Sequence, residues 1–188
     1  MTEYQKLYSG ISKVAWGYVF LYFDINLGSV DILPAFVGYL LFLTAIDRLN
    51  HAERELSLLR TMGMLLAAWH GGKWLLSWFG VVPEGVWQFV DILIAIVNLY
   101  FHFQLLTNLA SVAAKYQKEG CRQDEKLLRY RTIQTVVLTA MEMVLQISSL
   151  LSESWVYLAF PLMIVYIIVG ICLIRALFVL RNCLATEE

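Results

Sequence analysis

Positive charge alternates with apolar runs along this chain, in a pattern typical of a protein that crosses a membrane several times. Six apolar runs predict spans at 11–23, 34–47, 59–79, 86–109, 132–151 and 155–174. All but one of the fourteen Lys and Arg residues lie before the first span, after an even-numbered span, or within the first three residues of the span that follows: Lys6, Lys13, Arg48, Arg54, Arg60, Lys115, Lys118, Arg122, Lys126, Arg129, Arg131, Arg175 and Arg181. The gaps after the odd-numbered spans carry only acidic charges. The positive-inside rule therefore predicts that both termini lie in the cytoplasm.

The composition agrees with this prediction. The chain has 188 residues, of which 60% are hydrophobic and 15% charged, whereas soluble domains are about a quarter charged. We expect an all-α polytopic membrane protein, with one six-helix transmembrane domain over 1–188 and a cytoplasmic amphipathic connection at 110–131. The cytoplasmic loops account for the basic residues, so we expect the lipid bilayer as a partner and no nucleic acid.

The first two apolar runs are too short to cross a bilayer alone. Each forms about 20 Å of helix, against a hydrocarbon core of about 30 Å. The connection between them, with Asp24, Asn26 and Asp31, is expected to place polar groups in the outer leaflet. It is either part of a binding site, as short interrupted spans are in transporters, or a structured cap. In the cap, Asp31 or Ser29 would cap the second helix and Pro34 would lie in its first turn.

This hairpin also carries a resemblance. The run from Tyr22 to Gly28, followed by Asp-Ile-Leu-Pro-Ala-Phe-Val-Gly-Tyr from Asp31 to Tyr39, resembles uncharacterised small membrane proteins of Firmicutes-type bacteria. Those proteins carry a D-I/L-L-P-D-F-I-G-Y segment after a short first helix, and this chain has Ala35 where they often have Asp. The resemblance covers about the first fifty residues and implies a bacterial cytoplasmic membrane, without implying an activity.

Four main ionisable residues lie inside predicted spans, where a charge is costly and is therefore a candidate for function. They are His70, Lys73, Asp91 and Glu142. Lys73 and Asp91 lie at equal distances on either side of the turn near Val82, so in an antiparallel hairpin they reach the same depth and are expected to pair. Such a pair either fixes the register of two helices or belongs to a solute pathway.

Polar residues form stripes on two further faces. Span 86–109 carries Asp91, Ala95, Asn98 and His102 on one face, and span 132–151 carries Thr135, Thr139, Glu142, Gln146 and Ser149. Together with His70, these stripes predict a polar interior cavity. Within it, Glu142 has three possible states: it pairs with His70, His102 or Lys73, it binds a cation, or it is protonated.

Motifs of known chemistry are missing from the sequence. There is no nucleophile elbow, zinc-protease helix or phosphate-binding loop, so we expect no enzyme and no cofactor. Cys121, Cys172 and Cys183 have no metal-binding spacing, and two of them lie in predicted cytoplasmic segments, so we expect neither a metal site nor a disulfide.

These features predict a protein that binds or transports a small cationic or amine-bearing solute. The alternative is an accessory or scaffold subunit of a membrane complex, whose polar stripes only hold helices together. By size and number of spans the chain is similar to substrate-binding subunits of energy-coupling-factor vitamin importers, which work with a transport partner. The candidate solute-binding residues are Asp24, Asn26, Asp31, His70, Lys73, Asp91, Asn98, His102, Glu142 and Gln146.

Overall fold

The computed structural model describes residues 2–23, 26–27, 30–31, 34–80, 86–150, 157 and 159–184, and within these ranges it leaves the side chains of 26, 27, 30, 31, 86, 88, 145–150 and 159 undescribed. Six helices and one two-residue antiparallel hairpin make up this part of the chain. In order they are α1 (Glu3–Tyr22), β1 (Asn26–Leu27), β2 (Val30–Asp31), α2 (Ala35–Leu49), α3 (Leu56–Trp78), α4 (Val86–Tyr116), α5 (Gln123–Leu150) and α6 (Ala159–Asn182).

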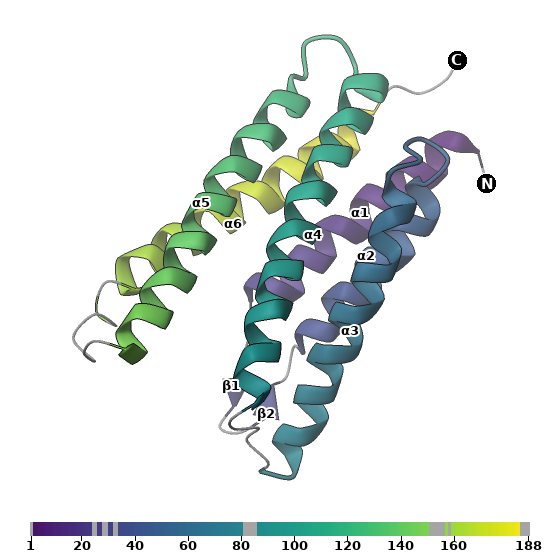
Figure 1. Ribbon diagram of the computed structural model, residues 1–188. Helices are drawn as coiled ribbons and strands as arrows, with labels where there is room; N and C mark the ends of the chain where they lie inside the picture. The colour runs from purple at the N-terminus through teal and green to yellow at the C-terminus, as the bar shows by residue number, and fades with distance from the viewer. Residues whose placement is uncertain are drawn as a thin grey trace.

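The helices form a closed ring in which each one packs against the next along the chain and α6 returns to α1. Figure 1 shows both termini at the end of the bundle that holds the α4–α5 connection, with the β1–β2 hairpin at the opposite end. We refer to these as the terminal end and the hairpin end. The even number of helices brings the two termini together, as the predicted span order requires.

Glycine allows the closest helix contact in the ring. A Cβ atom on Gly17 of α1 would lie 3.0 Å from the backbone oxygen of Gly38 on α2, and one on Gly38 would lie 2.9 Å from the oxygen of Gly17. The two backbones therefore cross at this pair, where no side chain fits. A third glycine, Gly170 of α6, accommodates the ring of Tyr22, whose carbons would lie 2.4 Å from an added Cβ. That contact closes the ring between the last helix and the first.

The centre of the bundle is aromatic. Tyr18, Tyr39, Phe42 and Phe101 are fully buried. Their rings lie against the buried imidazole of His102, at centroid distances from 5.4 to 6.1 Å. Residues from α1, α2 and α4 thus meet in one cluster, which we call the aromatic centre.

Two helix ends differ from the limits of the apolar runs. α1 begins at Glu3, where Thr2 and Gln5 form a reciprocal capping box, so its 20 residues span ~30 Å. The apolar run that starts at Ile11 is only its inner part, and only α2, with 15 residues, stays short. The expectation of a short first helix is therefore wrong, because a capped polar turn extends it beyond the apolar run.

The predicted connection 110–131 is mostly helical. α4 continues to Tyr116 and α5 starts at Gln123. Gly120 lies between the two helices with a φ of +88°, a conformation that glycine adopts readily and that ends the helical path. The turn is tied to the end of α6, because the backbone amide of Lys118 donates to the carbonyl of Cys183 at 2.9 Å.

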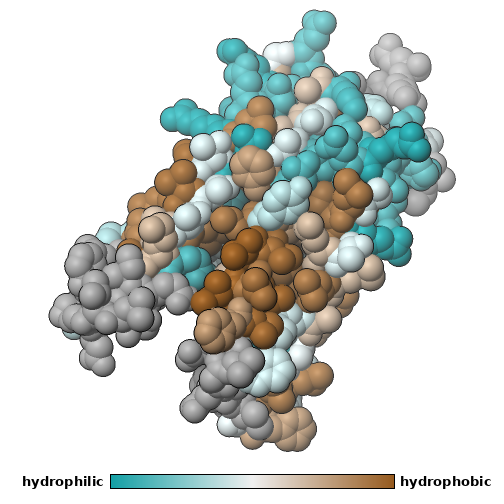
Figure 2. Space-filling model, viewed as in Figure 1, coloured by the Kyte–Doolittle hydropathy of each residue, from teal (hydrophilic) through white to brown (hydrophobic). Residues whose placement is uncertain are grey.

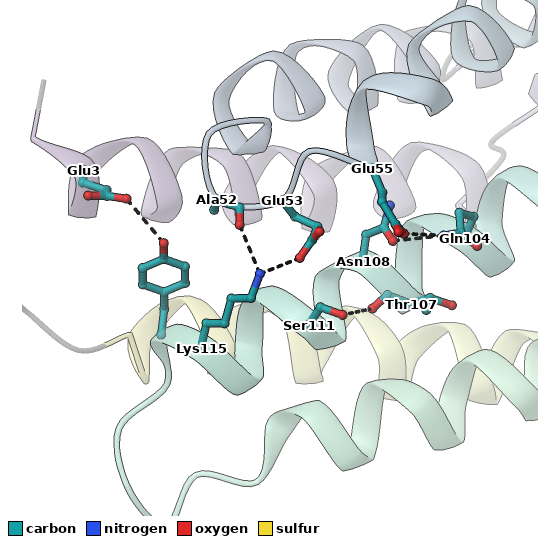
Figure 3. Close-up of polar contacts among 10 residues, drawn as sticks. Glu3, Ala52, Glu53, Glu55, Gln104, Thr107, Asn108, Ser111 and Lys115 are labelled. Carbon is teal, nitrogen blue, oxygen red and sulfur yellow. Dashed lines mark hydrogen bonds and ion pairs between the residues drawn. The ribbon is translucent and has the colours of Figure 1, made fainter.

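Polar contacts also hold α4 at the terminal end (Figure 3). The ammonium of Lys115 lies 2.8 Å from a carboxylate oxygen of Glu53, in the α2–α3 connection, and the amide of Gln104 donates to Glu55 at 3.4 Å. The hydroxyl of Tyr116 donates to Glu3 of α1 at 3.4 Å. These bonds join α4 to elements from the first third of the chain.

Two helices are long and apolar enough to cross a membrane, namely α4 over Phe89–Tyr116 and α6 over Phe160–Asn182. This count covers only the described residues and supports membrane association. On the face drawn in Figure 2, hydrophilic residues gather at the terminal end, while apolar residues dominate the surface towards the hairpin end.

Candidate solute-binding cavity

The predicted pair between α3 and α4 is confirmed. The ammonium of Lys73 lies 2.9 Å from a carboxylate oxygen of Asp91, which also accepts a hydrogen bond from the indole of Trp69 at 3.3 Å. Trp69 and Lys73 are four residues apart and therefore lie on the same face of α3. They approach Asp91 from that face together. The carboxylate of Asp91 thus has two partners and its charge is compensated by Lys73.

Two connected hollows lie beside this pair. The first, the polar chamber, has a volume of about 220 Å³ and is lined by Trp69, His70, Lys73, Asp91, Ile92, Ile94, Ala95, Asn98 and Glu142. The second, the apolar chamber, has about 400 Å³ and is lined by Ile92, Ala95, Ile96, Asn98, Leu99, Leu138, Thr139, Glu142 and Met143. They share four lining residues, Ile92, Ala95, Asn98 and Glu142, so they lie side by side, and we refer to them together as the cavity.

The apolar chamber lies between α4 and α5, because every residue of its lining comes from one of these two helices. The surface in Figure 2 is hollowed on this side of the bundle, between α4 and the half of α5 nearer the hairpin end. Ile96 and Met143 are 59% and 58% exposed, so the chamber opens sideways rather than at an end of the bundle. Volumes of this size are in the range of small-molecule sites.

Glu142 is the carboxylate without a partner in this cavity. Among the described residues its side chain makes neither a hydrogen bond nor an ion pair. The hypothesis that it pairs with a basic residue is wrong in this structure, because each candidate is engaged elsewhere. Lys73 binds Asp91, His70 stacks on Tyr39 with centroids 5.0 Å apart, and His102 contacts Tyr18.

Asn98 stands on the wall that the two chambers share. Its side-chain oxygen accepts a hydrogen bond from the hydroxyl of Tyr39 at 2.7 Å. Tyr39 belongs to the aromatic centre, so this bond holds the side-chain amide of Asn98 from the side of the packed core. Asn98 therefore links the cavity wall to the packed core.

His102 does not line either chamber, so its assignment to the cavity is wrong. Its Nδ1 lies 3.2 Å from the hydroxyl of Tyr18, and its ring is buried in the aromatic centre. The residue shares a helix face with Asn98 but lies one turn, ~6 Å, further towards the terminal end. At that depth, aromatic rings from α1 and α2 fill the space that is open beside Asn98.

The remaining candidate solute-binding residues come from the connection between α1 and α2 and from the end of α5. Asn26 and Asp31 are Cα partners across the β1–β2 pair, while Asp24 lies outside the described residues. Asp31 is not the cap of α2, because the helix has Pro34 as its N-cap residue. Gln146 lies in α5, but its side chain is outside the description.

The apolar wall was not predicted from the sequence. Ile96, Leu99, Leu138 and Met143 look in the sequence like residues that face lipid. Hydropathy does not separate an apolar side chain in a cavity from one in a bilayer, since both surroundings are equally apolar. Only the divergence of α4 from α5, which no local pattern encodes, turns these residues into a chamber.

At the terminal end, away from the cavity, a hydrogen bond changes the pKa of Asp124. The side-chain amide of Gln117 donates to Asp124 at 2.8 Å, and this hydrogen bond lowers the pKa of the carboxyl below its usual value. Gln117 also accepts from the backbone amide of Gln123 at 2.8 Å. Its two bonds hold the start of α5.

The sequence matches no family model, no curated protein and no solved structure. A functional assignment therefore rests on the geometry of the cavity itself.

Proposed function

We propose that this chain is a six-span protein of a bacterial cytoplasmic membrane, with both termini in the cytoplasm, and that it binds a small cationic or amine-bearing solute. Two apolar helices, the segregated basic residues and the resemblance of the first hairpin support the membrane placement. In this orientation the cavity lies in the outer half of the bundle. We infer binding or transport rather than catalysis, since the cavity residues form no nucleophile–base pair.

The observation that carries the proposal is the unpaired carboxylate of Glu142 where the two chambers meet. With Lys73 and Asp91 compensating each other, it leaves the cavity with one net negative charge. A charge at membrane depth attracts an opposite charge far more strongly than it does in water. A cation is therefore the complementary occupant.

A thermal-shift screen of purified protein against amines, amino acids, vitamins and metal ions tests this proposal. A ligand at a hundredfold excess over its Kd stabilises the folded state by ~2.7 kcal/mol. We expect stabilisation by cationic compounds that is lost in Glu142→Gln and kept in Glu119→Gln, a carboxylate in the α4–α5 turn. Stabilisation that survives Glu142→Gln unchanged would show that the site lies elsewhere.

One observation favours the alternative of an accessory subunit. The apolar chamber opens on the side of the bundle, so an apolar side chain on a helix of a partner protein fits there as well. In that case no solute stabilises the protein. Bulky substitution of Met143, at the mouth, should then release a co-purifying partner, whereas Glu142→Gln should leave it bound.

A further inference from the structure

We propose that the occupant is an amphiphilic monovalent amine, with its ammonium group at Glu142 and a single apolar tail in the chamber between α4 and α5. This inference rests on the proposed function, since it names the ligand class of the same cavity. Three properties of the cavity lead to this ligand class. They are the uncompensated charge of Glu142, the division into two chambers, and the sideways opening of the apolar chamber.

The charge of the cavity favours a ligand that carries one positive charge. Lys73 and Asp91 form an ion pair, which leaves Glu142 as the single uncompensated carboxylate among the lining residues that the structure describes. No group of three His, Cys, Asp or Glu residues able to hold a metal ion occurs among the described residues. Divalent cations need several oxygen ligands, whereas one ammonium needs one carboxylate and a few hydrogen-bond acceptors.

The division of the cavity selects an apolar tail. Six of the nine residues that line the apolar chamber are Ala, Ile, Leu or Met, and its polar members, Asn98, Thr139 and Glu142, leave the rest of the wall apolar. A small hydrophilic cation would leave this chamber unfilled. A hydrocarbon tail fills it and gains, relative to the same amine dissolved in water, ~0.8 kcal/mol for each buried methylene group.

The volume of the apolar chamber favours a ligand with one hydrocarbon tail rather than two. If a methylene group takes up ~30 Å³, about the share of a water molecule in the liquid, a chamber of about 400 Å³ holds roughly a dozen of them. A diacyl phospholipid is too large for this space, and its phosphate would be repelled by Glu142. The sideways opening lets a single-chain amine reach the carboxylate directly from the surrounding acyl chains.

The test is equilibrium binding of a radiolabelled decylammonium ion to the full chain in phosphatidylcholine nanodiscs. Unlabelled primary alkylammonium ions from butyl to tetradecyl compete with it, and so do alcohols and sulfates of the same chain lengths. Empty nanodiscs measure partition into lipid, which is subtracted. We expect the affinity, expressed relative to the free amine in water, to rise about fourfold per methylene, the ratio that corresponds to the ~0.8 kcal/mol per methylene group. It should level off near a dozen carbons. Ammonium ions should bind at least tenfold more tightly than alcohols of equal length.

Two variants separate the head from the tail. Glu142→Gln should remove the preference for ammonium over alcohol. Thr139→Trp, which fills the apolar chamber from α5, should abolish the dependence on tail length while butylammonium still binds. Val136→Trp, at an exposed position of α5 outside both chambers, is the matched control and should behave as the wild type. Thr139→Trp keeps the test valid even if Glu142→Gln fails to fold.

The outcomes distinguish this inference from the proposal beneath it. Binding of small cations that depends on Glu142 but not on tail length would overturn the inference and leave the proposed function standing. Equal binding of alcohols and ammonium ions would overturn it as well, since the site would then recognise only hydrocarbon. Absence of binding by every cation would overturn both. If phosphatidylethanolamine in the nanodisc displaced the labelled amine, the occupant would be a lipid headgroup, and the single-chain proposal would be wrong.

Discussion

At the scale of single residues, the proposed membrane placement changes what the ion pair between Lys73 and Asp91 contributes to stability. Their side chains are 46% and 43% exposed when only protein atoms are counted. In water such a pair contributes about 0–1 kcal/mol. Beside lipid, the same exposure means contact with acyl chains or with the cavity, so loss of one partner leaves a charge without compensation.

We therefore expect Lys73→Met to destabilise the protein by about 3 kcal/mol, in the range for a broken buried pair. The double variant Lys73→Met with Asp91→Leu should recover at least half of that loss, because no charge remains uncompensated. Thermal or denaturant unfolding of the two single variants and the double variant in one lipid system measures the coupling. A double variant whose loss equals the sum of the two single losses would show that the pair does not interact.

At the scale of elements, the crossing of α1 and α2 depends on Gly17 and Gly38. Introducing side chains at this crossing forces the two helices apart, because the nearest atoms are backbone oxygens and the ring of Phe42. We expect Gly17→Leu to cost about 3 kcal/mol or more, at the upper end of overpacking effects. The unfolding midpoint of the purified protein gives the measurement.

Gly72 of α3 is the matched control for this prediction. Nothing lies within 4 Å of a Cβ atom added there. Gly72→Ala should therefore stabilise the protein by up to about 1 kcal/mol, the difference in helix propensity between the two residues. If both glycine variants lost similar stability, the cost would come from the helix itself and not from the crossing.

The start of α5 should make stability depend on pH. The pKa of Asp124 is lowered in the folded state by the hydrogen bond from Gln117, so the bond stabilises the fold above the ordinary carboxyl pKa of about 3.9. This stabilisation is lost as the pH falls through the folded-state pKa. The wild type should thus lose stability relative to Asp124→Asn between pH 5 and 3. A difference that stays constant over this range would contradict the assignment.

How far the sequence predicts such elements depends on whether the cause is local. The pairing of Lys73 with Asp91 follows from counting outward from one turn, and the break at Gly120 follows from one residue type. The burial of His102 does not follow from either, because it depends on rings from α1 and α2, far away in the chain. The apolar chamber is not predictable from the sequence for the same reason, since it depends on the angle between α4 and α5.

At the scale of the whole molecule, the proposed six-span topology makes a direct prediction. In intact cells, a membrane-impermeant thiol reagent should not label Cys121 or Cys183, which lie at the terminal end. Labelling should appear once the cells are permeabilised. A cysteine at Tyr157, an exposed residue just before α6, should react from outside in a chain that carries Ser at positions 121 and 183. Labelling of both ends from the same side would contradict six spans.

The contact between Gly170 and Tyr22 has a consequence for how the protein is made. In the proposed six-span topology, the first helix enters the membrane long before the last one leaves the ribosome, so during synthesis one flank of α1 meets only lipid. Pairing across nearly the full length of a chain is slow compared with pairing of neighbouring helices. Until α6 arrives, the bundle is an open arc with two unpaired edges. A nascent chain halted before α6 should therefore be cleared by membrane proteases faster than the finished protein, although five of its helices are already in place.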